Sequence, residues 1–111
     1  MSVPALKLCP ARKAALDTGF AAAFGGAPER YFSAPGRTEI GGNHTDHQRG
    51  RVLAAAVNLD TVAAVRCNGT DTIRILSTGY PMSTVCLKEL TPVPAEVNTT
   101  PALIRGVAAR F

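Results

Sequence analysis

The sequence contains no tryptophan, and only 5% of its 111 residues are aromatic. Its core must therefore rest on Ala, Val, Leu and Ile, and a chain of this length has room for one domain with a thin margin of stability. No apolar run approaches the length of a membrane span, so we expect no membrane partner. The N-terminus, with Lys7, Pro10 and Arg12, also lacks the apolar stretch of a signal peptide.

Cysteine is scarce, and its spacing matches no paired motif. The chain has three cysteines, Cys9, Cys67 and Cys86, and no Cys-x-x-Cys pair. An odd number without that spacing argues against both a disulfide scaffold and a zinc site. Reduced thiols, and hence a cytoplasmic location, are the expectation.

The positive charge is modest and dispersed. Twelve basic and eight acidic residues give a net charge of +4, and no basic run is interleaved with aromatics. A nucleic-acid partner is therefore not expected. A phosphorylated partner stays open, because arginine suits phosphate and carboxylate oxygens.

The first part of the chain favours a helix over residues 11–24. Leu16, Phe20 and Phe24 recur at i, i+4 and i+8 and would form one stripe along it. The Gly25-Gly26 pair is expected to end this helix.

The middle of the chain is rich in Val and Ala in short runs, which favours β-strands. Asp60 interrupts one apolar run, and the Asn68-Gly69 pair predicts a turn. Residues 91–98, with two prolines, are expected to form a loop. The expected strands cover residues 31–34, 52–59, 61–67, 72–77 and 83–87.

Near its end the chain favours a second helix, with Thr100 as its cap and Pro101 in its first turn. Together these patterns predict an α+β fold, with a mixed, largely antiparallel sheet, an N-terminal helix and a C-terminal helix. No stop signal follows the last helix, so we expect residues 1–111 to be a piece of a longer protein. Its uncovered apolar face would favour self-association. That face would comprise Leu103, Ile104, Val107, Ala108 and Phe111.

The window from residue 34 to residue 50, "APGRTEIGGNHTDHQRG", holds both histidines of the chain among glycines and short polar residues. Gly41 and Gly42 let a ligand approach the backbone closely. The side chains that follow both donate and accept hydrogen bonds, which suits a ligand whose surface carries hydroxyls. Arg37 could balance a carboxylate or a phosphate. The polar candidates after the glycines are Asn43, His44, Thr45 and Asp46.

Three other interpretations of this window stay open. Thr45 and Asp46 are common turn formers and could merely close the loop. His44, Asp46 and His47 could bind a metal, although no third imidazole and no nearby cysteine would complete the site. The glycines could form a phosphate loop, although the sequence has no G-x-x-x-x-G-K-[ST].

The stretch "APGRTEIGGNHTDH" resembles the galactokinase signature, P-G-R-x-N-x-I-G-E-H-x-D-Y, of the superfamily that includes homoserine, mevalonate and phosphomevalonate kinases. The similarity covers residues 20–66 well. It implies that Arg37 lies beside the reactive sugar hydroxyl and stabilises the transition state. Asn43, His44, Thr45 and Asp46 would bind the sugar, with Asn43 in place of the usual Glu. Two further departures are His47 in place of Tyr and Glu39 in place of Asn.

The resemblance implies the N-terminal galactose-binding portion of a cytoplasmic, ATP-dependent galactokinase, which would phosphorylate the sugar's 1-hydroxyl. ATP and magnesium would be cofactors of the complete protein. The family's phosphate loop, of the form G-L-S-S-S, occurs nowhere in the 111 residues. We therefore expect this chain alone to be inactive and to hold neither cofactor nor metal. The alternative is a non-catalytic, galactose-sensing regulator related to galactokinase.

Overall fold

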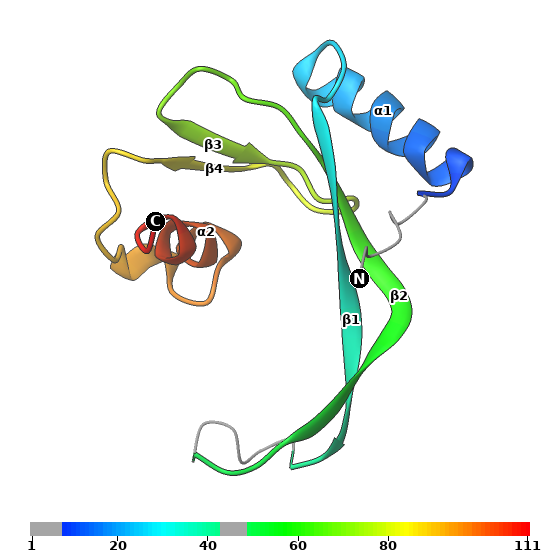
Figure 1. The fold of residues 1–111 in the computed structure, drawn as a ribbon. Helices are drawn as coiled ribbons and strands as arrows, with labels where there is room; N and C mark the ends of the chain where they lie inside the picture. The colour runs from blue at the N-terminus through cyan, green and yellow to red at the C-terminus, as the bar shows by residue number, and fades with distance from the viewer. Residues whose placement is uncertain (1–7, 43–48) are drawn as a thin grey trace. The chain divides into compact units, whose positions relative to one another are not determined.

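The computed structural model describes residues 8–42 and 49–111, which form two compact units that divide after Cys67. The first unit contains helix α1 and strands β1 and β2, and the second contains β3, β4 and helix α2 (Figure 1). Two helices combined with antiparallel strand pairs confirm the predicted α+β class. Within the described ranges, no helix has both the length and the apolar character needed to span a bilayer.

Helix α1 (Pro10–Phe24) follows the predicted apolar stripe. Phe20 is buried, and Leu16 and Phe24 are half-buried on the same face. The rings of Phe20 and Phe24 lie 5.1 Å apart between centroids. The helix ends at Gly25, whose φ of +73° is one that glycine adopts without strain.

Strands β1 (Arg30–Gly41) and β2 (Leu53–Val65) form an antiparallel pair. β1 is longer than predicted, and β2 joins the two strands predicted over residues 52–59 and 61–67 into one. The predicted first strand stopped at residue 34 because Pro35-Gly36 has the composition of a turn, yet β1 continues through both residues. A proline is tolerated here because the strand register shifts directly after Pro35. β2 continues through Asp60 because partners in α1 and β1 bind its carboxylate.

The second unit pairs strand β3 (Thr72–Ile75) with strand β4 (Ser83–Cys86), again antiparallel. Val85, only 1% exposed, is its central buried side chain. The predicted turn at Asn68-Gly69 is present, and the Asn68 amide oxygen accepts a hydrogen bond from the Thr70 N–H. A short 3₁₀ helix, η2 (Pro94–Glu96), lies within the segment predicted as a loop.

Helix α2 (Thr100–Ala108) begins one residue earlier than predicted, with Thr99 rather than Thr100 at the cap position. The Thr99 hydroxyl donates back to the Glu96 carbonyl, so it does not cap the helix. Arg105 is buried and holds both carboxylate oxygens of Glu96, at 2.9 and 3.0 Å. This bidentate pair joins α2 to η2.

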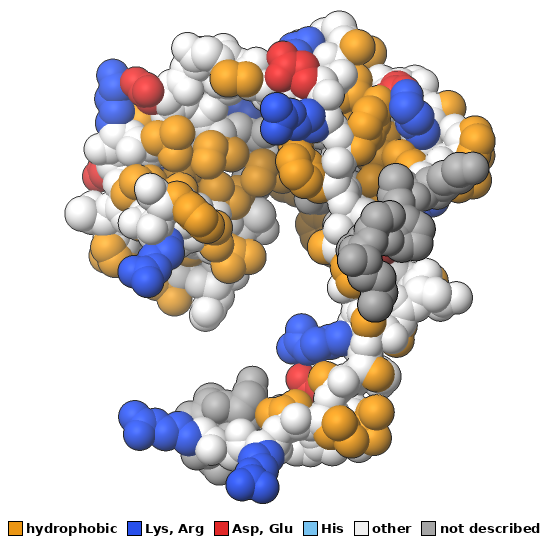
Figure 2. All heavy atoms as spheres, in the orientation of Figure 1, with side chains coloured by type: hydrophobic (Ala, Val, Ile, Leu, Met, Phe, Trp, Pro, Cys, Tyr) orange, Lys and Arg blue, Asp and Glu red, His pale blue; other side chains and the backbone are white. Residues whose placement is uncertain are grey.

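The outer face of α2 is apolar and exposed. Leu103 is 70% exposed and Val107 is 54% exposed, while Ile104 and Ala108 are half-buried. Only part of the predicted apolar face is therefore covered within the described residues. Figure 2 shows apolar side chains on the surface over the part of the second unit where α2 lies in Figure 1.

Candidate functional site

Arg37 lies on β1, opposite Ala56 of β2. Its side chain is 71% exposed, and its Nη2 lies 3.4 Å from the Oε1 of Glu39, two residues further along the strand. Alternate residues of a strand share a face, which explains this contact. An exposed ion pair at this distance contributes little to stability, so the guanidinium is accessible to an incoming anion.

Asn43, His44, Thr45, Asp46 and His47 lie outside the described residues. Their assignment to sugar binding, and the alternative of a metal site, therefore stay predictions. Within the described ranges, no group of three His, Cys, Asp or Glu side chains could hold a metal ion.

The residues on either side of this stretch lead into the two strands of one hairpin, β1 and β2. Gly41, the last residue of β1, pairs with Leu53, the first residue of β2. Gly42 has a φ of +79° and Arg49 a φ of +59°, both in the left-handed region. A non-glycine residue adopts this conformation mainly in tight turns. The chain therefore leaves and re-enters the hairpin beside the end of β1 that carries Arg37.

The strand register is irregular directly before Arg37. Pro35 pairs with Asp60 and Arg37 pairs with Ala56, so β1 advances two residues (35 to 37) while β2 advances four (60 to 56). Figure 1 shows β2 bending midway along the hairpin. Gly36 lies inside the irregular segment, where an added Cβ would meet the Cγ2 of Val57 at 3.2 Å. The absence of a side chain at residue 36 lets the two strands approach there.

Asp60 joins all three elements of the first unit. Its Oδ1 accepts from the Nη1 of Arg12 in α1 at 2.5 Å, and its Oδ2 accepts from the hydroxyl of Ser33 in β1 at 2.5 Å. The Ser33 hydrogen bond, and after it the Arg12 guanidinium, lower the pKa of Asp60. We call Arg12, Ser33 and Asp60 the Asp60 clamp.

The sequence patterns did not predict this clamp, because Asp60 stands out in them only as a break in an apolar run. A signal for it was nonetheless present. An acid inside an otherwise apolar strand requires partners for its charge. What the sequence could not supply was the identity of those partners, since Arg12 lies 48 residues away along the chain.

A second contact holds the C-terminal end of α1. The Arg66 guanidinium, directly after β2, donates to the carbonyls of Phe24 and Ala27 at 3.3 Å each. It also lies over the ring of Phe20, with 5.2 Å between the guanidinium carbon and the ring centroid. A cation at this position binds the Phe24 carbonyl, which the helix leaves unsatisfied, and complements the helix dipole.

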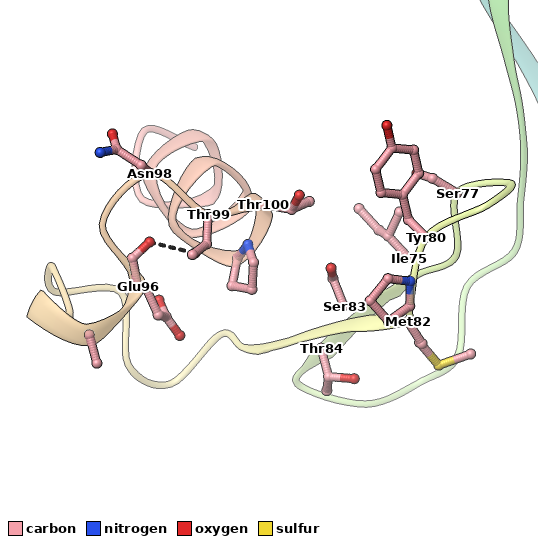
Figure 3. Close-up of a pocket in the computed structure, with 13 residues that line it drawn as sticks. Ile75, Ser77, Tyr80, Met82, Ser83, Thr84, Glu96, Asn98, Thr99 and Thr100 are labelled. Carbon is pink, nitrogen blue, oxygen red and sulfur yellow. Dashed lines mark hydrogen bonds between the residues drawn. The ribbon is translucent and has the colours of Figure 1, made fainter.

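A groove of about 670 Å³ lies in the second unit (Figure 3). Tyr80, Met82 and Ser83 line it from the hairpin of β3 and β4, and Thr99 and Thr100 line it from the start of α2. The described residues that line it belong to the second unit, whereas all of the predicted site residues fall in the first. It offers hydroxyls and apolar surface, and the Glu96 carboxylate beside it is engaged with Arg105.

The family match lies within the first unit. Residues 18–67 match the family described as "Galactokinase galactose-binding signature". The galactokinase of Lacticaseibacillus casei (strain BL23) is 41% identical over 63 residues, which cover 57% of this chain and 16% of that protein. The galactokinase of Streptococcus mutans serotype c is 35% identical over 69 residues, covering 62% of this chain and 18% of that protein. No solved structure matches the chain.

These matches confirm the resemblance to galactokinase. Over its N-terminal portion, the chain is similar to galactokinases, and residues 18–67 match the galactose-binding signature. The signature includes the second half of α1, both strands of the first hairpin and every predicted site residue. The aligned residues span less than a fifth of these curated relatives.

Proposed function

We propose that this chain, whose residues 18–67 carry the galactokinase galactose-binding signature, recognises galactose as part of a galactokinase. The parent protein would transfer the γ-phosphate of ATP to the 1-hydroxyl of the sugar. The observation that carries the proposal is the match of the signature to one hairpin, on which Arg37 is exposed beside the polar window.

The proposed roles follow from the chemistry of the side chains. Asn43, His44, Thr45 and Asp46 would donate and accept hydrogen bonds with the sugar hydroxyls. Arg37 would stabilise the negative charge that develops on the transferred phosphoryl group. Its exposed contact with Glu39 at 3.4 Å is weak enough to be exchanged for phosphate oxygens.

ATP and magnesium would bind the complete protein through residues beyond those of this chain. The 111 residues hold no G-L-S-S-S-like phosphate loop. Phosphoryl transfer requires such groups, because its catalysis rests on positioning and on electrostatic stabilisation of the phosphates. The chain itself would therefore supply sugar recognition, and the parent protein would act in the cytoplasm.

Titration calorimetry with galactose tests the recognition role. Asp46→Asn should weaken binding by roughly tenfold or more, because hydrogen bonds to an ionised acceptor are about twice as strong as neutral ones. Asn43→Ala should cost less. Asp71→Asn serves as the matched control, because Asp71 is an exposed acid of the second unit whose carboxylate lies 3.4 Å from the Nζ of Lys88. Equal galactose affinity in wild type and Asp46→Asn would refute the assignment of the sugar site.

A coupled assay for ADP tests whether phosphoryl transfer requires the complete parent protein. The pure chain should show no galactose-dependent turnover, and sustained turnover would contradict the proposal. In the complete parent protein, Arg37→Lys should lower kcat, since lysine lacks the planar, bidentate donors of arginine. Galactose binding by the complete protein without any turnover would instead favour the sensing regulator.

A further inference from the structure

We propose that the Asp60 clamp is a positioning device that sets the face on which β1 presents Arg37. The consequence for sugar affinity rests on the proposed function, whereas the effect on Arg37 itself does not. The clamp residues are Arg12, Ser33 and Asp60, and none of them belongs to the predicted sugar site.

The clamp fixes the hairpin at one specific point. Asp60 pairs with Pro35, and a proline has no N–H to donate to the neighbouring strand. The Nη2 of Arg12 instead donates to the Asp60 carbonyl, at 3.2 Å. Arg12 and Ser33 also bind one carboxylate oxygen of Asp60 each. The direction of the carboxylate is thereby fixed from two sides.

Immediately after the Pro35–Asp60 pair, the register between β1 and β2 shifts. The irregular segment lies between the Pro35–Asp60 pair and the Arg37–Ala56 pair, with Gly36 packed against Val57. Successive side chains of a strand point to opposite faces, so a slip of one residue would turn Arg37 to the other face. A register is least well specified where the ladder is interrupted and the residues are small. The clamp holds the end of the irregular segment that precedes Arg37.

The competing explanation is that the clamp only fastens α1 and contributes to stability. A neighbouring ion pair on the same helix separates the two explanations. Lys13 binds Asp17 at 2.8 Å and lies over the ring of Tyr31 in β1, 5.0 Å from its centroid. Its side chain is 50% exposed, against 49% for Arg12. Arg12 and Lys13 thus match in exposure and in partner type, but only Arg12 reaches the strand residue beside the register shift.

The experiment compares Arg12→Gln with Lys13→Gln and follows Arg37 directly. The readout is the Nε–Hε NMR signal of Arg37, recorded without sugar and assigned by its loss in Arg37→Lys. Arg12→Gln should shift or broaden this signal, and Lys13→Gln should leave it in place. With galactose, Arg12→Gln should lower the affinity at least about twofold, the low end for a residue that acts through another.

Melting curves establish whether each variant is folded, and a second variant tests the clamp from its other side. Asp60→Asn, which keeps the size of the side chain, should perturb the Arg37 signal as Arg12→Gln does. If Asp60→Asn fails to fold, Arg12→Gln alone decides. An unchanged Arg37 signal in a folded Arg12→Gln variant overturns the positioning role. If the wild-type chain binds no galactose, the proposed function falls, and the sugar-free Arg37 signal still decides the positioning role.

Discussion

Gly26 and Arg66 are expected to act as one unit at the end of α1, and Gly26→Ala tests this. Gly26 has a φ of +72°, and a Cβ built on it would lie 2.7 Å from the Nη1 of Arg66. The substitution therefore has two costs. It forces a non-glycine residue into the left-handed region, and it displaces the guanidinium from the carbonyls of Phe24 and Ala27.

The backbone part should cost about 1–2 kcal/mol, the usual penalty for a left-handed non-glycine residue. The displaced guanidinium would lose two hydrogen bonds at 3.3 Å and its position over the Phe20 ring. Because these contacts are solvent-exposed, we assign them about 1–2 kcal/mol together. Gly26→Ala should thus lower the free energy of unfolding by about 2–4 kcal/mol, a large share of the stability of a small protein.

A double-mutant cycle measured by urea unfolding separates the two parts. Arg66→Ala alone should cost only the contact part, about 1–2 kcal/mol. The double variant should then cost little more than Gly26→Ala, because the contacts of Arg66 can be lost only once. Sites that do not interact are additive within about 0.3–0.5 kcal/mol. Additivity of Gly26→Ala and Arg66→Ala would show that the two residues are independent and would refute this reasoning.

Three further outcomes are expected in the second unit. Val85→Ala should lower the free energy of unfolding by about 2–3 kcal/mol in urea titrations, since Val85 is 1% exposed, whereas Val107→Ala on the exposed helix face should change it by less than about 0.5 kcal/mol. The Arg105 guanidinium lowers the pKa of Glu96, so the ionised carboxylate stabilises the fold above the ordinary pKa of 4.5. This stability is lost as the pH falls through the lower, folded-state pKa, and thermal melts of Glu96→Gln should show a weaker acid dependence. Sedimentation should detect self-association of the chain at high concentration, and Leu103→Lys should reduce it, because Leu103 is 70% exposed on an apolar face.

Local patterns predicted the helices well and the strands less well. The Leu16, Phe20 and Phe24 stripe and the glycines after it were sufficient to locate α1. Pro35 and Gly36 misled the prediction of β1, because their turn preference is a local property. The actual strand accommodates them through a shift in register with β2, which depends on a residue pairing far along the chain.

In the candidate site, too, local motifs predict some residues and miss the contacts between residues far apart in the sequence. A short motif predicts Arg37 as a site residue, and this stays a prediction. The Asp60 clamp joins residues 12, 33 and 60, which no local pattern links. The family resemblance could not reveal it either, because the matched segment begins at residue 18, after Arg12. Within that segment, residues near its start contact residues at its end. Arg66 binds the Phe24 carbonyl, and the backbone N–H of Cys67 donates to Glu29. The signature therefore corresponds to a closed physical unit, a hairpin tied to the end of its own helix. Because that helix continues back to Arg12, the residue that binds Asp60 beside the register shift lies outside the matched segment.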